Sequence, residues 1–207
     1  MPAASTSTLL ILGAGGHGRV VADAALAQGR WARLRVTDRD EQRVGEELLP
    51  WLRVERIDEA IAGSTEVHVA IGSALARARE ARATGLPLAT VVHPQATVSR
   101  HAVIGEGCFI AAGAIVAPGA RLGAGVIVNH GAVVDHDVQV GAFTHVAPRV
   151  ALGGGVHVGE RVLVGAGASV LPGVRIADDV VVGAGAVVRD NLEAAGVYAG
   201  VPARRMR

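Results

Sequence analysis

The sequence predicts two consecutive folds: a small parallel α/β domain over residues 1–92 and a coil of short parallel strands over residues 93–207. Two observations predict them. The first third of the chain alternates strand-like and helix-like segments of the lengths found in α/β domains. From Val98 to Val188, every sixth residue is Val, Ile or Leu, at all sixteen positions of the series. Such an unbroken period indicates a repeat fold rather than an irregular globular core.

A period of six is a multiple of the strand period of two and matches no helix, so each repeat should form one short strand and a corner. The residue two positions before each aliphatic is Ala, Val, Thr or Cys and never charged, so both side chains should face inward. Stacked parallel strands satisfy their backbone hydrogen bonds with the coils above and below. Glycine often follows the aliphatic residue, where the chain must turn, at positions 105, 123, 141, 153, 159, 165 and 183.

This pattern resembles the left-handed parallel β-helix of the hexapeptide-repeat acyltransferases, in which three repeats make one triangular coil. Sixteen repeats would then give about five coils. The resemblance also implies a homotrimer with active sites between neighbouring prisms.

The α/β segment should form about half of a doubly wound, Rossmann-like fold, with helices between parallel strands. A Gly-rich turn follows the first strand, and Gly29 should end the first helix. The second helix, rich in Ala and Arg, should follow Gly72-Ser73 and end near Thr84. The expected strands are Leu9–Leu12, Leu34–Thr37, Val67–Ile71 and Leu88–Val92, and the first helix is Arg19–Gln28.

The turn after the first strand satisfies G-x-G-x-x-G through Gly13, Gly15 and Gly18, and Asp38 follows twenty residues later. In dinucleotide-binding proteins this pattern holds a diphosphate on helix N–H groups and a ribose on the acid. No second nucleotide-binding half follows here, which disfavours NAD and leaves a diphosphate or a sugar as the ligand. A tight turn without any ligand is the alternative. His17 favours the ligand, because it adds a polar donor without a structural need.

Bulk composition excludes several classes of protein. The net charge is +1 and the basic residues are dispersed, so we expect no nucleic-acid surface. The single Cys108 falls on an inward position and should be a buried thiol in a reducing compartment. Residues 1–8 lack a basic region, and no stretch approaches the ~20 apolar residues that cross a bilayer. We therefore expect a cytoplasmic protein without a membrane partner.

Five of the eight histidines lie in the repeat, and one stands out. His136 lies between two carboxylates, Asp135 and Asp137, in the gap between two inward-facing valines where the chain must turn. An imidazole flanked by carboxylates is suited to act as a general base near neutral pH. Strand alternation points His145 and His157 outward. We interpret His101, His130 and His157 as surface histidines.

Several motifs together resemble the NeuD/PglD-type bacterial nucleotide-sugar acetyltransferases, and the resemblance covers nearly the whole chain. They are Gly13-Ala14-Gly15-Gly16-His17-Gly18, Ala70-Ile71-Gly72-Ser73 with Arg77, His93-Pro94, Asn129, Val134-Asp135-His136-Asp137 and Gly200-Val201-Pro202-Ala203. The resemblance implies that His136 is the catalytic base, that Asp137 increases its basicity and that His145 contacts the acetyl group of acetyl-CoA. It places further acetyl-CoA contacts, mainly through the backbone, at Gly154, Ala166 and Ala184. It places the nucleotide sugar at Gly15, Gly16, His17, Asp38 and Gly72.

The sequence therefore predicts an acetyl-CoA-dependent N-acetyltransferase that acts on a nucleotide-linked amino sugar, such as a 4-amino-4,6-dideoxy sugar for a surface polysaccharide. A sugar O-acetyltransferase and a non-catalytic nucleotide-sugar-binding trimer are the alternatives. Some relatives have two acids where this chain has Thr37-Asp38, so the sequence does not decide whether the nucleotide is UDP, GDP or dTDP. Carbonic anhydrases of similar shape bind zinc with three histidines, two of which are five residues apart. No pair here has that spacing, so we expect no metal.

Overall fold

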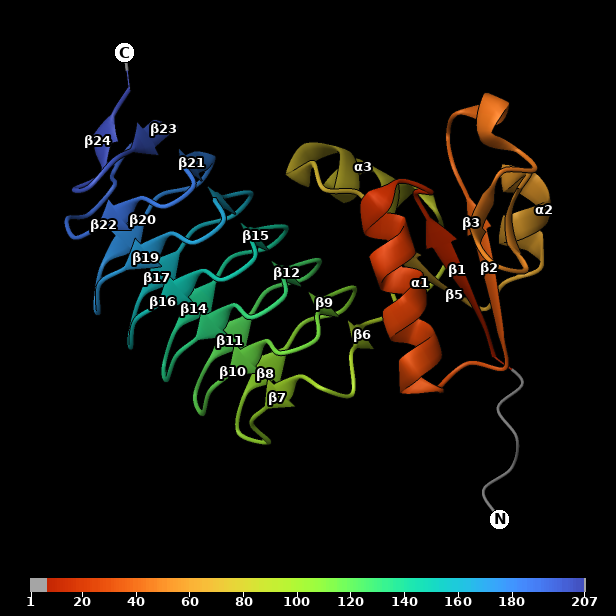
Figure 1. Ribbon diagram of the computed structural model, residues 1–207, viewed down its shortest axis with the longest axis horizontal. Coiled ribbons are helices and arrows are strands. Elements are labelled where there is room, and N and C mark those ends of the chain that lie inside the picture. The colour runs from red at the N-terminus through yellow and green to blue at the C-terminus, as the bar shows by residue number, and fades with distance from the viewer. Residues whose placement is uncertain (1–6, 207) are drawn as a thin grey trace. The chain divides into compact units, whose positions relative to one another are not determined.

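The structure, a computed structural model, describes residues 7–206 (Figure 1). The chain divides into two compact units, residues 1–94 and 95–207, which we call unit 1 and unit 2. Among the described residues, no helix is both long and apolar enough to cross a membrane.

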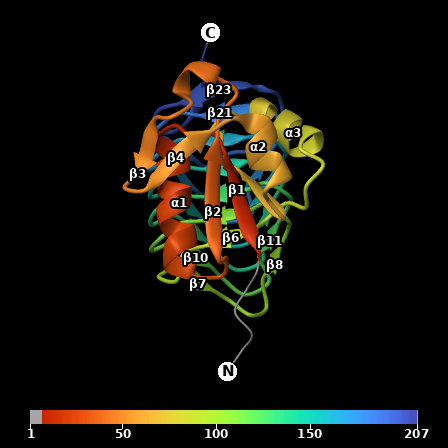
Figure 2. The same ribbon diagram turned by 90° about the vertical axis from the view of Figure 1, so that its right-hand side faces the viewer.

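Unit 1 is a five-stranded sheet in the order β3-β4-β2-β1-β5, parallel except for β3 (Figure 2). Its strands are β1 (Thr8–Leu12), β2 (Arg33–Thr37), β3 (Glu47–Leu49), β4 (Leu52–Glu55) and β5 (Glu66–Val69). Its helices are α1 (Gly16–Gln28), the short 3-10 helix η1 (Glu41–Arg43), α2 (Ile57–Ala62) and α3 (Ala74–Ala83), and a short strand β6 (Val91–Val92) follows. The carboxyl ends of β1, β2 and β5 therefore meet at one edge.

Helices cover both faces of this sheet. Leu10 and Leu12 of β1 form a buried cluster with Val67 and Val69 of β5, against which α2 packs through Ala60. The alternate residues of β1, Leu9 and Ile11, are also fully buried, on the opposite face. Helix α1 ends at Gln28, and Gly29 caps it: with a left-handed φ of 64°, its N–H donates to the carbonyls of Ala25 and Leu26.

Unit 2 is a prism of stacked coils with three sheets as its faces, which are parallel except for the last strand pair of the chain (Figure 1). The chain visits the faces in turn, and each coil takes eighteen residues, so Val116 pairs with Val134 and Val134 with Leu152. Face 1 holds β7 (Thr97–Val98), β10 (Ile115–Val116), β13 (Val133–Val134), β16 (Ala151–Leu152), β19 (Ser169–Val170) and β22 (Val187–Val188). Face 2 holds β8 (Val103–Ile104), β11 (Arg121–Leu122), β14 (Gln139–Val140), β17 (His157–Val158) and β20 (Arg175–Ile176). Face 3 holds β9 (Phe109–Ile110), β12 (Ile127–Val128), β15 (His145–Val146), β18 (Leu163–Val164), β21 (Val180–Val182), β23 (Gly196–Ala199) and β24 (Arg204–Arg205).

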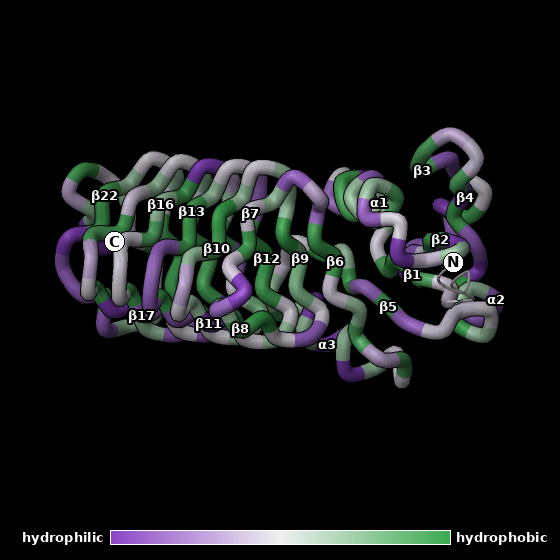
Figure 3. Tube along the Cα trace, turned by 90° about the horizontal axis from the view of Figure 1, so that it is seen from below, coloured by the Kyte–Doolittle hydropathy of each residue, from purple (hydrophilic) through white to green (hydrophobic). Residues whose placement is uncertain are grey.

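The aliphatic series forms the core of the prism, as predicted. Every member from Ile110 to Val188 is buried, and only Val98 and Ile104, in the first coil, are partly exposed. Figure 3 shows the hydrophobic residues repeating from coil to coil. The glycines after the aliphatic residues have a packing reason: a Cβ on Gly123 would lie 2.8 Å from the Ala142 nitrogen in the next coil. The predicted left-handed parallel β-helix is confirmed.

The expected elements of unit 1 are present with shifted ends. Helix α1 begins at Gly16, three residues before the expected start, because the end of the glycine turn is itself helical. Strand β5 ends at Val69 instead of Ile71, and β6 keeps only the last two residues of its expected strand. The β3–β4 hairpin and α2 were not expected. Their segments are too short to show a period.

Candidate functional site

A cavity of about 470 Å³ opens at the carboxyl ends of β1, β2 and β5. The chain passes from β1 to β2 on one side and later returns to β5 on the other, and such a crossing point is where open α/β sheets bind ligands. All five residues predicted to bind the nucleotide sugar line it: Gly15, Gly16, His17, Asp38 and Gly72.

The glycines of this cavity have two different reasons to be glycine. Gly13 has a φ of +116°, and a Cβ there would lie 2.7 Å from the Ala70 carbonyl oxygen. A Cβ on Gly18 would collide with the Gly13 carbonyl oxygen. By contrast, a Cβ on Gly15, Gly16 or Gly72 would meet nothing within 4 Å. The first two glycines shape the turn, and the other three leave backbone accessible to a ligand.

The start of helix α1 is suited to an anion. Gly15 is its N-cap, no side chain caps it, and its first turn holds no acidic residue. The first N–H groups of a helix have no intrahelical partner and carry a partial positive charge. A diphosphate placed here would accept hydrogen bonds from them.

Asp38 fixes the turn from the end of β2. Its Oδ2 accepts a hydrogen bond of 2.7 Å from the Ala14 N–H, and its Oδ1 accepts one of 3.1 Å from the Asp40 N–H. The guanidinium of Arg43 lies 3.4 Å from Oδ2 and donates to the Ala14 carbonyl at 2.8 Å. Oδ1 retains capacity to accept a ribose hydroxyl.

An ion-pair bridge crosses the end of β1 on the other side of the cavity. Glu80 of α3 is 3% exposed, and its two carboxylate oxygens accept hydrogen bonds from Arg39 at 2.6 Å and from Arg79 at 3.0 Å. Burial opposes ionisation of Glu80, but the hydrogen bonds from Arg39 and Arg79 outweigh it and lower the pKa of the carboxyl. Two arginine side chains are thereby held at the cavity wall.

The residues of this bridge, together with Arg43, were not predicted from the sequence. Arg39 directly follows Asp38, which could have suggested a role in the same site. Glu80 lies in an Arg-rich helical segment that gives no sign of a buried carboxylate. Arg77, quoted only as a motif residue, is buried and donates to the carbonyls of Ile71 and Gly72 at 2.7 and 2.9 Å. It holds the loop that carries Gly72.

In unit 2, His136 and Asp137 lie at the corner between face 1 and face 2, after β13. Nδ1 of His136 lies 2.9 Å from Oδ2 of Asp137, and the His136 N–H donates to Oδ1 of Asp135 at 2.7 Å. The hydrogen bond to Asp137, followed by the charge of Asp135, raises the pKa of His136 above its ordinary value. The imidazole is exposed. It is therefore a strengthened base open to a ligand.

Glycines in the adjacent coils make room for this pair. Gly154, eighteen residues after His136, lies directly against the imidazole: a Cβ there would come within 2.6 Å of Cε1. Gly119, eighteen residues before Asp137, would likewise collide with the carboxylate of Asp137 if it had a side chain. Asp137 itself has a φ of +60°, a conformation that Asp tolerates better than most residues. Gly154 thus has a second reason for lacking a side chain besides the predicted acetyl-CoA contact.

His145 lies elsewhere on the same prism. It points outward from β15 on face 3, and its Nε2 lies 3.2 Å from the Asn129 amide nitrogen. Ala166 and Ala184 lie at the corner between face 3 and face 1, and both are exposed. The corner that carries His136 is the one opposite face 3. A single copy of the prism therefore cannot bring His136 and His145 together.

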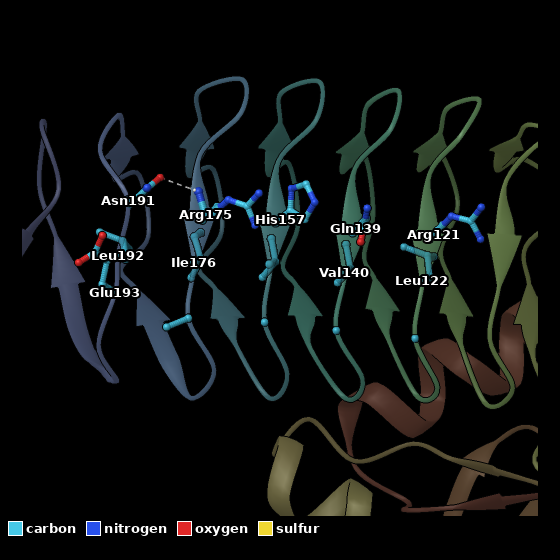
Figure 4. Close-up of a pocket in the computed structure, with 15 residues that line it drawn as sticks. Arg121, Leu122, Gln139, Val140, His157, Arg175, Ile176, Asn191, Leu192 and Glu193 are labelled. Atoms are coloured by element: carbon cyan, nitrogen blue, oxygen red, sulfur yellow. Dashed lines mark hydrogen bonds between the residues drawn. The ribbon is translucent and has the colours of Figure 1, made fainter.

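Unit 2 also has a groove of about 650 Å³ along face 2. Figure 4 shows its row of outward side chains, Arg121, Gln139, His157 and Arg175, on successive coils. Nδ1 of His157 lies 2.9 Å from the Gly155 carbonyl oxygen, which links the groove to the turn that carries Gly154. None of the predicted site residues lines this groove. Its size alone does not identify it with the catalytic site.

Within the part of the chain that the structure describes, no group of three or more His, Cys, Asp or Glu side chains could hold a metal ion. Cys108 is buried, and its thiol donates to the Gly123 carbonyl at 3.1 Å.

Two family models match the chain. The PglD N-terminal domain matches residues 8–83, and the bacterial transferase hexapeptide model, of six repeats, matches residues 101–136 and 155–190. A comparison with curated proteins finds no match.

Solved structures resemble the whole chain. The acetyltransferase domain of PglB from Neisseria gonorrhoeae is 34% identical, with a TM-score of 0.88, and the match covers 97% of this chain and 100% of that one. A mutant of GDP-perosamine N-acetyltransferase from Caulobacter crescentus, in complex with CoA and GDP-perosamine, is 38% identical, with a TM-score of 0.89 and 97% of each chain covered. WeeI from Acinetobacter baumannii, at 19% identity and a TM-score of 0.65, shares the fold.

Proposed function

This chain belongs to the NeuD/PglD-type family of bacterial nucleotide-sugar acetyltransferases, and from that premise we propose that it transfers the acetyl group of acetyl-CoA to the amino group of a nucleotide-linked sugar. The proposed acceptor is a 4-amino-4,6-dideoxy sugar destined for a surface glycan. The observation that carries the proposal is the pairing of two sites in one chain. Unit 1 has a cavity of about 470 Å³ with accessible glycine backbone, and unit 2 has a carboxylate-supported imidazole at an open corner.

The relatives support the same chemistry. The PglB acetyltransferase domain has also been solved with acetyl-CoA, at 33% identity to this chain. The C. crescentus N-acetyltransferase was solved with CoA and GDP-perosamine. Both a thioester donor and a nucleotide-linked amino sugar therefore have precedents among relatives that match this chain nearly from end to end.

We assign His136 as the general base. With Asp137 ionised, Nδ1 carries the proton and Nε2 carries the lone pair. The sugar amine attacks the thioester carbonyl carbon, and Nε2 accepts the proton that the amine sheds. As the tetrahedral intermediate collapses, the C–S bond breaks and the imidazolium returns that proton to the CoA thiolate. The products are the N-acetyl sugar and CoA, and His136 is neutral again.

We assign the acetyl-CoA contacts to His145, Gly154, Ala166 and Ala184. His145 and Asn129 offer polar groups from face 3. The two alanines are small and exposed, so a pantetheine arm could reach the backbone beside them. Gly154 lies against His136 at the other corner, which would place the thioester near the base.

A trimer would bring the His136 corner of one protomer close to the Ala166 and Ala184 corner of the next. Face 1 lies between the His136 corner and the corner of Ala166 and Ala184. If face 1 turns toward a threefold axis, the first corner of one protomer meets the second corner of the next. The outward side chains of face 1 are uncharged, which suits burial at an interface: Thr97, Ile115, Val133, Ala151, Ser169 and Val187.

The test is thiol release from acetyl-CoA with UDP-, GDP- and dTDP-linked amino sugars, and with free amino sugars and sialic acid as comparison acceptors. We expect release with a nucleotide-linked amino sugar. His136→Ala should lower turnover by ~10² to 10⁴ with the fold retained, because general-base catalysis contributes about that factor. His101→Ala, which removes another exposed histidine of the prism, should leave turnover unchanged.

Each other outcome has a definite meaning. Thiol release only with sialic acid or another hydroxyl acceptor would show that the protein is an O-acetyltransferase instead of an N-acetyltransferase. A fully active His136→Ala protein would remove His136 from the mechanism. Nucleotide-sugar binding without acetyl-CoA binding would favour a non-catalytic binding protein.

A further inference from the structure

A second, smaller cavity adjoins the one that would hold the diphosphate, and we propose that it receives the nucleobase and selects guanine. It has a volume of about 210 Å³ and shares Asp38 and Arg39 with the larger cavity. This inference rests on the proposed function, because it takes the ligand of unit 1 to be a nucleotide-linked sugar.

The position of the cavity follows the path of a nucleotide across the sheet. A diphosphate on the first turn of α1 places the ribose next to Asp38, at the end of β2. The base then continues past β2, toward the end of β4. There the smaller cavity is lined by the segment after β2, with Glu41 and Val44, and by the segment after β4, with Arg56, Ile57 and Asp58.

The size of the cavity suits one ring system. Whole small-molecule ligands occupy pockets of about 300–1,000 Å³, so 210 Å³ is too small for a nucleotide sugar but leaves room for its base. Val44 and Ile57 offer apolar surface against which a planar ring can pack. The larger cavity takes the remainder of the ligand.

The polar side chains of the cavity are available to a ligand. Glu41, Arg56 and Asp58 are exposed, and none forms a side-chain hydrogen bond or ion pair with a described residue. Arg39, in contrast, is held by Glu80. The cavity therefore offers two carboxylates as acceptors and one unengaged guanidinium as a donor.

Among guanine, uracil and thymine, guanine is the base whose edges match this set. Its N1–H and N2 amino groups are adjacent donors for a carboxylate, and its O6 and N7 are adjacent acceptors for an arginine fork. Uracil and thymine have a single N–H between two carbonyl groups. They could satisfy the arginine or one carboxylate oxygen, but they would leave a carboxylate facing a carbonyl oxygen. GDP-linked substrates should therefore bind more tightly than UDP- or dTDP-linked ones.

The experiment measures equilibrium binding of GDP, IDP, UDP and dTDP to the full chain by calorimetry, without acetyl-CoA. We expect GDP to bind at least about tenfold more tightly than UDP or dTDP, since one good bidentate base contact gives about this discrimination. IDP is guanosine diphosphate without the N2 amino group. It should bind more weakly than GDP by several-fold, which isolates the carboxylate contact.

Substitutions of the two carboxylates test which of them contacts the base. Asp58→Asn and Glu41→Gln, singly and together, should lower GDP affinity to the level of IDP while changing UDP affinity by less than about twofold. Asp23→Asn is the matched control, because it neutralises an exposed acid of α1 that lines neither cavity. It should leave the GDP to UDP ratio unchanged.

Three results would overturn the inference. UDP affinity equal to that of GDP in the wild-type protein would exclude guanine selection. Equal GDP and IDP affinities would exclude the carboxylate contact. A loss of affinity shared equally by all four nucleotides in the variants would indicate disturbed folding of the cavity instead of base recognition. Thiol release with a nucleotide sugar would leave the proposed function intact in each case, whereas failure of all four diphosphates to bind would contradict the proposed function as well.

Discussion

Asp137 combines a backbone requirement with a chemical one. The corner position that it occupies needs a left-handed φ, and glycine takes the equivalent position in neighbouring coils, at Gly119 and Gly155. Asp is among the few other residues that tolerate this conformation, and it brings a carboxylate to Nδ1 of His136. The corner thereby gains an acid–imidazole pair without added strain from a β-branched side chain.

Asp137→Asn should separate these two roles, because asparagine also tolerates a left-handed φ. Loss of the carboxylate removes the main cause of the raised His136 pKa. The imidazole is a base only when neutral, so activity rises with pH through that pKa, and the acidic limb of the kcat profile should move to lower pH. The plateau should also fall, by about 10- to 100-fold, the loss found when metal-bound histidines lose a carboxylate that orients the imidazole. An unshifted limb in steady-state profiles would contradict the pairing.

At the residue scale, the sequence marks as candidates the groups whose chemistry shows in one segment. His136 with its flanking acids lies at an open corner of the structure, and the Gly15-Gly16-His17 turn lies in a cavity; their roles stay predictions. The packing of Gly154 against His136 follows from the eighteen-residue coil, but it was not predicted from the sequence. The Arg39–Glu80 pair joins residues 41 apart, and no local pattern marks it.

At the element scale, the prism can be predicted because every strand obeys one rule. Val140→Asp should therefore unfold it or lower its melting temperature by more than about 10 °C, since an unpaired buried charge costs several kcal/mol. Val140 is 3% exposed. Gln139→Asp is the matched control: it places the same side chain one residue earlier on β14, facing solvent. Thermal unfolding followed by circular dichroism compares the two, and similar melting temperatures would refute the inward assignment.

The hairpin of unit 1 shows why other elements could not be predicted. Strand β3 has three residues and β4 four, and Trp51 between them has a φ of +68°. Two-residue alternation over so short a stretch is indistinguishable from chance, and Trp is not a residue that normally signals such a turn. Pro50 favours a turn at this point, but the left-handed φ of Trp51 has no signal in the sequence.

Strand β5 carries a buried histidine that should make unit 1 sensitive to acid. Burial, with a smaller contribution from the nearby Arg77 charge, lowers the pKa of His68 to about 4, although its Nδ1 bonds the Ala89 carbonyl at 2.9 Å. Between pH 6.5 and about 4 the unfolded chain binds a proton that the folded chain does not. Stability should be full above pH 6.5 and fall by roughly 3 kcal/mol as pH approaches 4.

The check is urea unfolding at pH 7 and pH 5 for the wild-type protein and His68→Asn. Asparagine keeps a donor near the Ala89 carbonyl but does not titrate. The variant should lose less stability between the two pH values than the wild type does. Equal losses would mean that other groups cause the acid sensitivity.

At the scale of the whole molecule, the two histidines proposed for the catalytic site, His136 and His145, lie on opposite sides of one prism, so the proposed site requires two protomers. If each site takes His136 from one protomer and His145 from the next, two inactive variants should complement each other. In randomly mixed trimers of His136→Ala and His145→Ala, about a quarter of the interfaces would pair an intact His136 with an intact His145. Purification on both tags removes the homotrimers, and every mixed trimer then has one such interface in three. Co-expression of the differently tagged chains should therefore recover about a third of the wild-type thiol release. Trimers that combine the double variant with either single variant should show no thiol release, because no interface then holds both side chains.

If every mixture is equally inactive, His136 and His145 do not act across an interface. The acetyl-CoA contact would then have to be sought among residues on the His136 side of the prism, beginning with the groove of face 2.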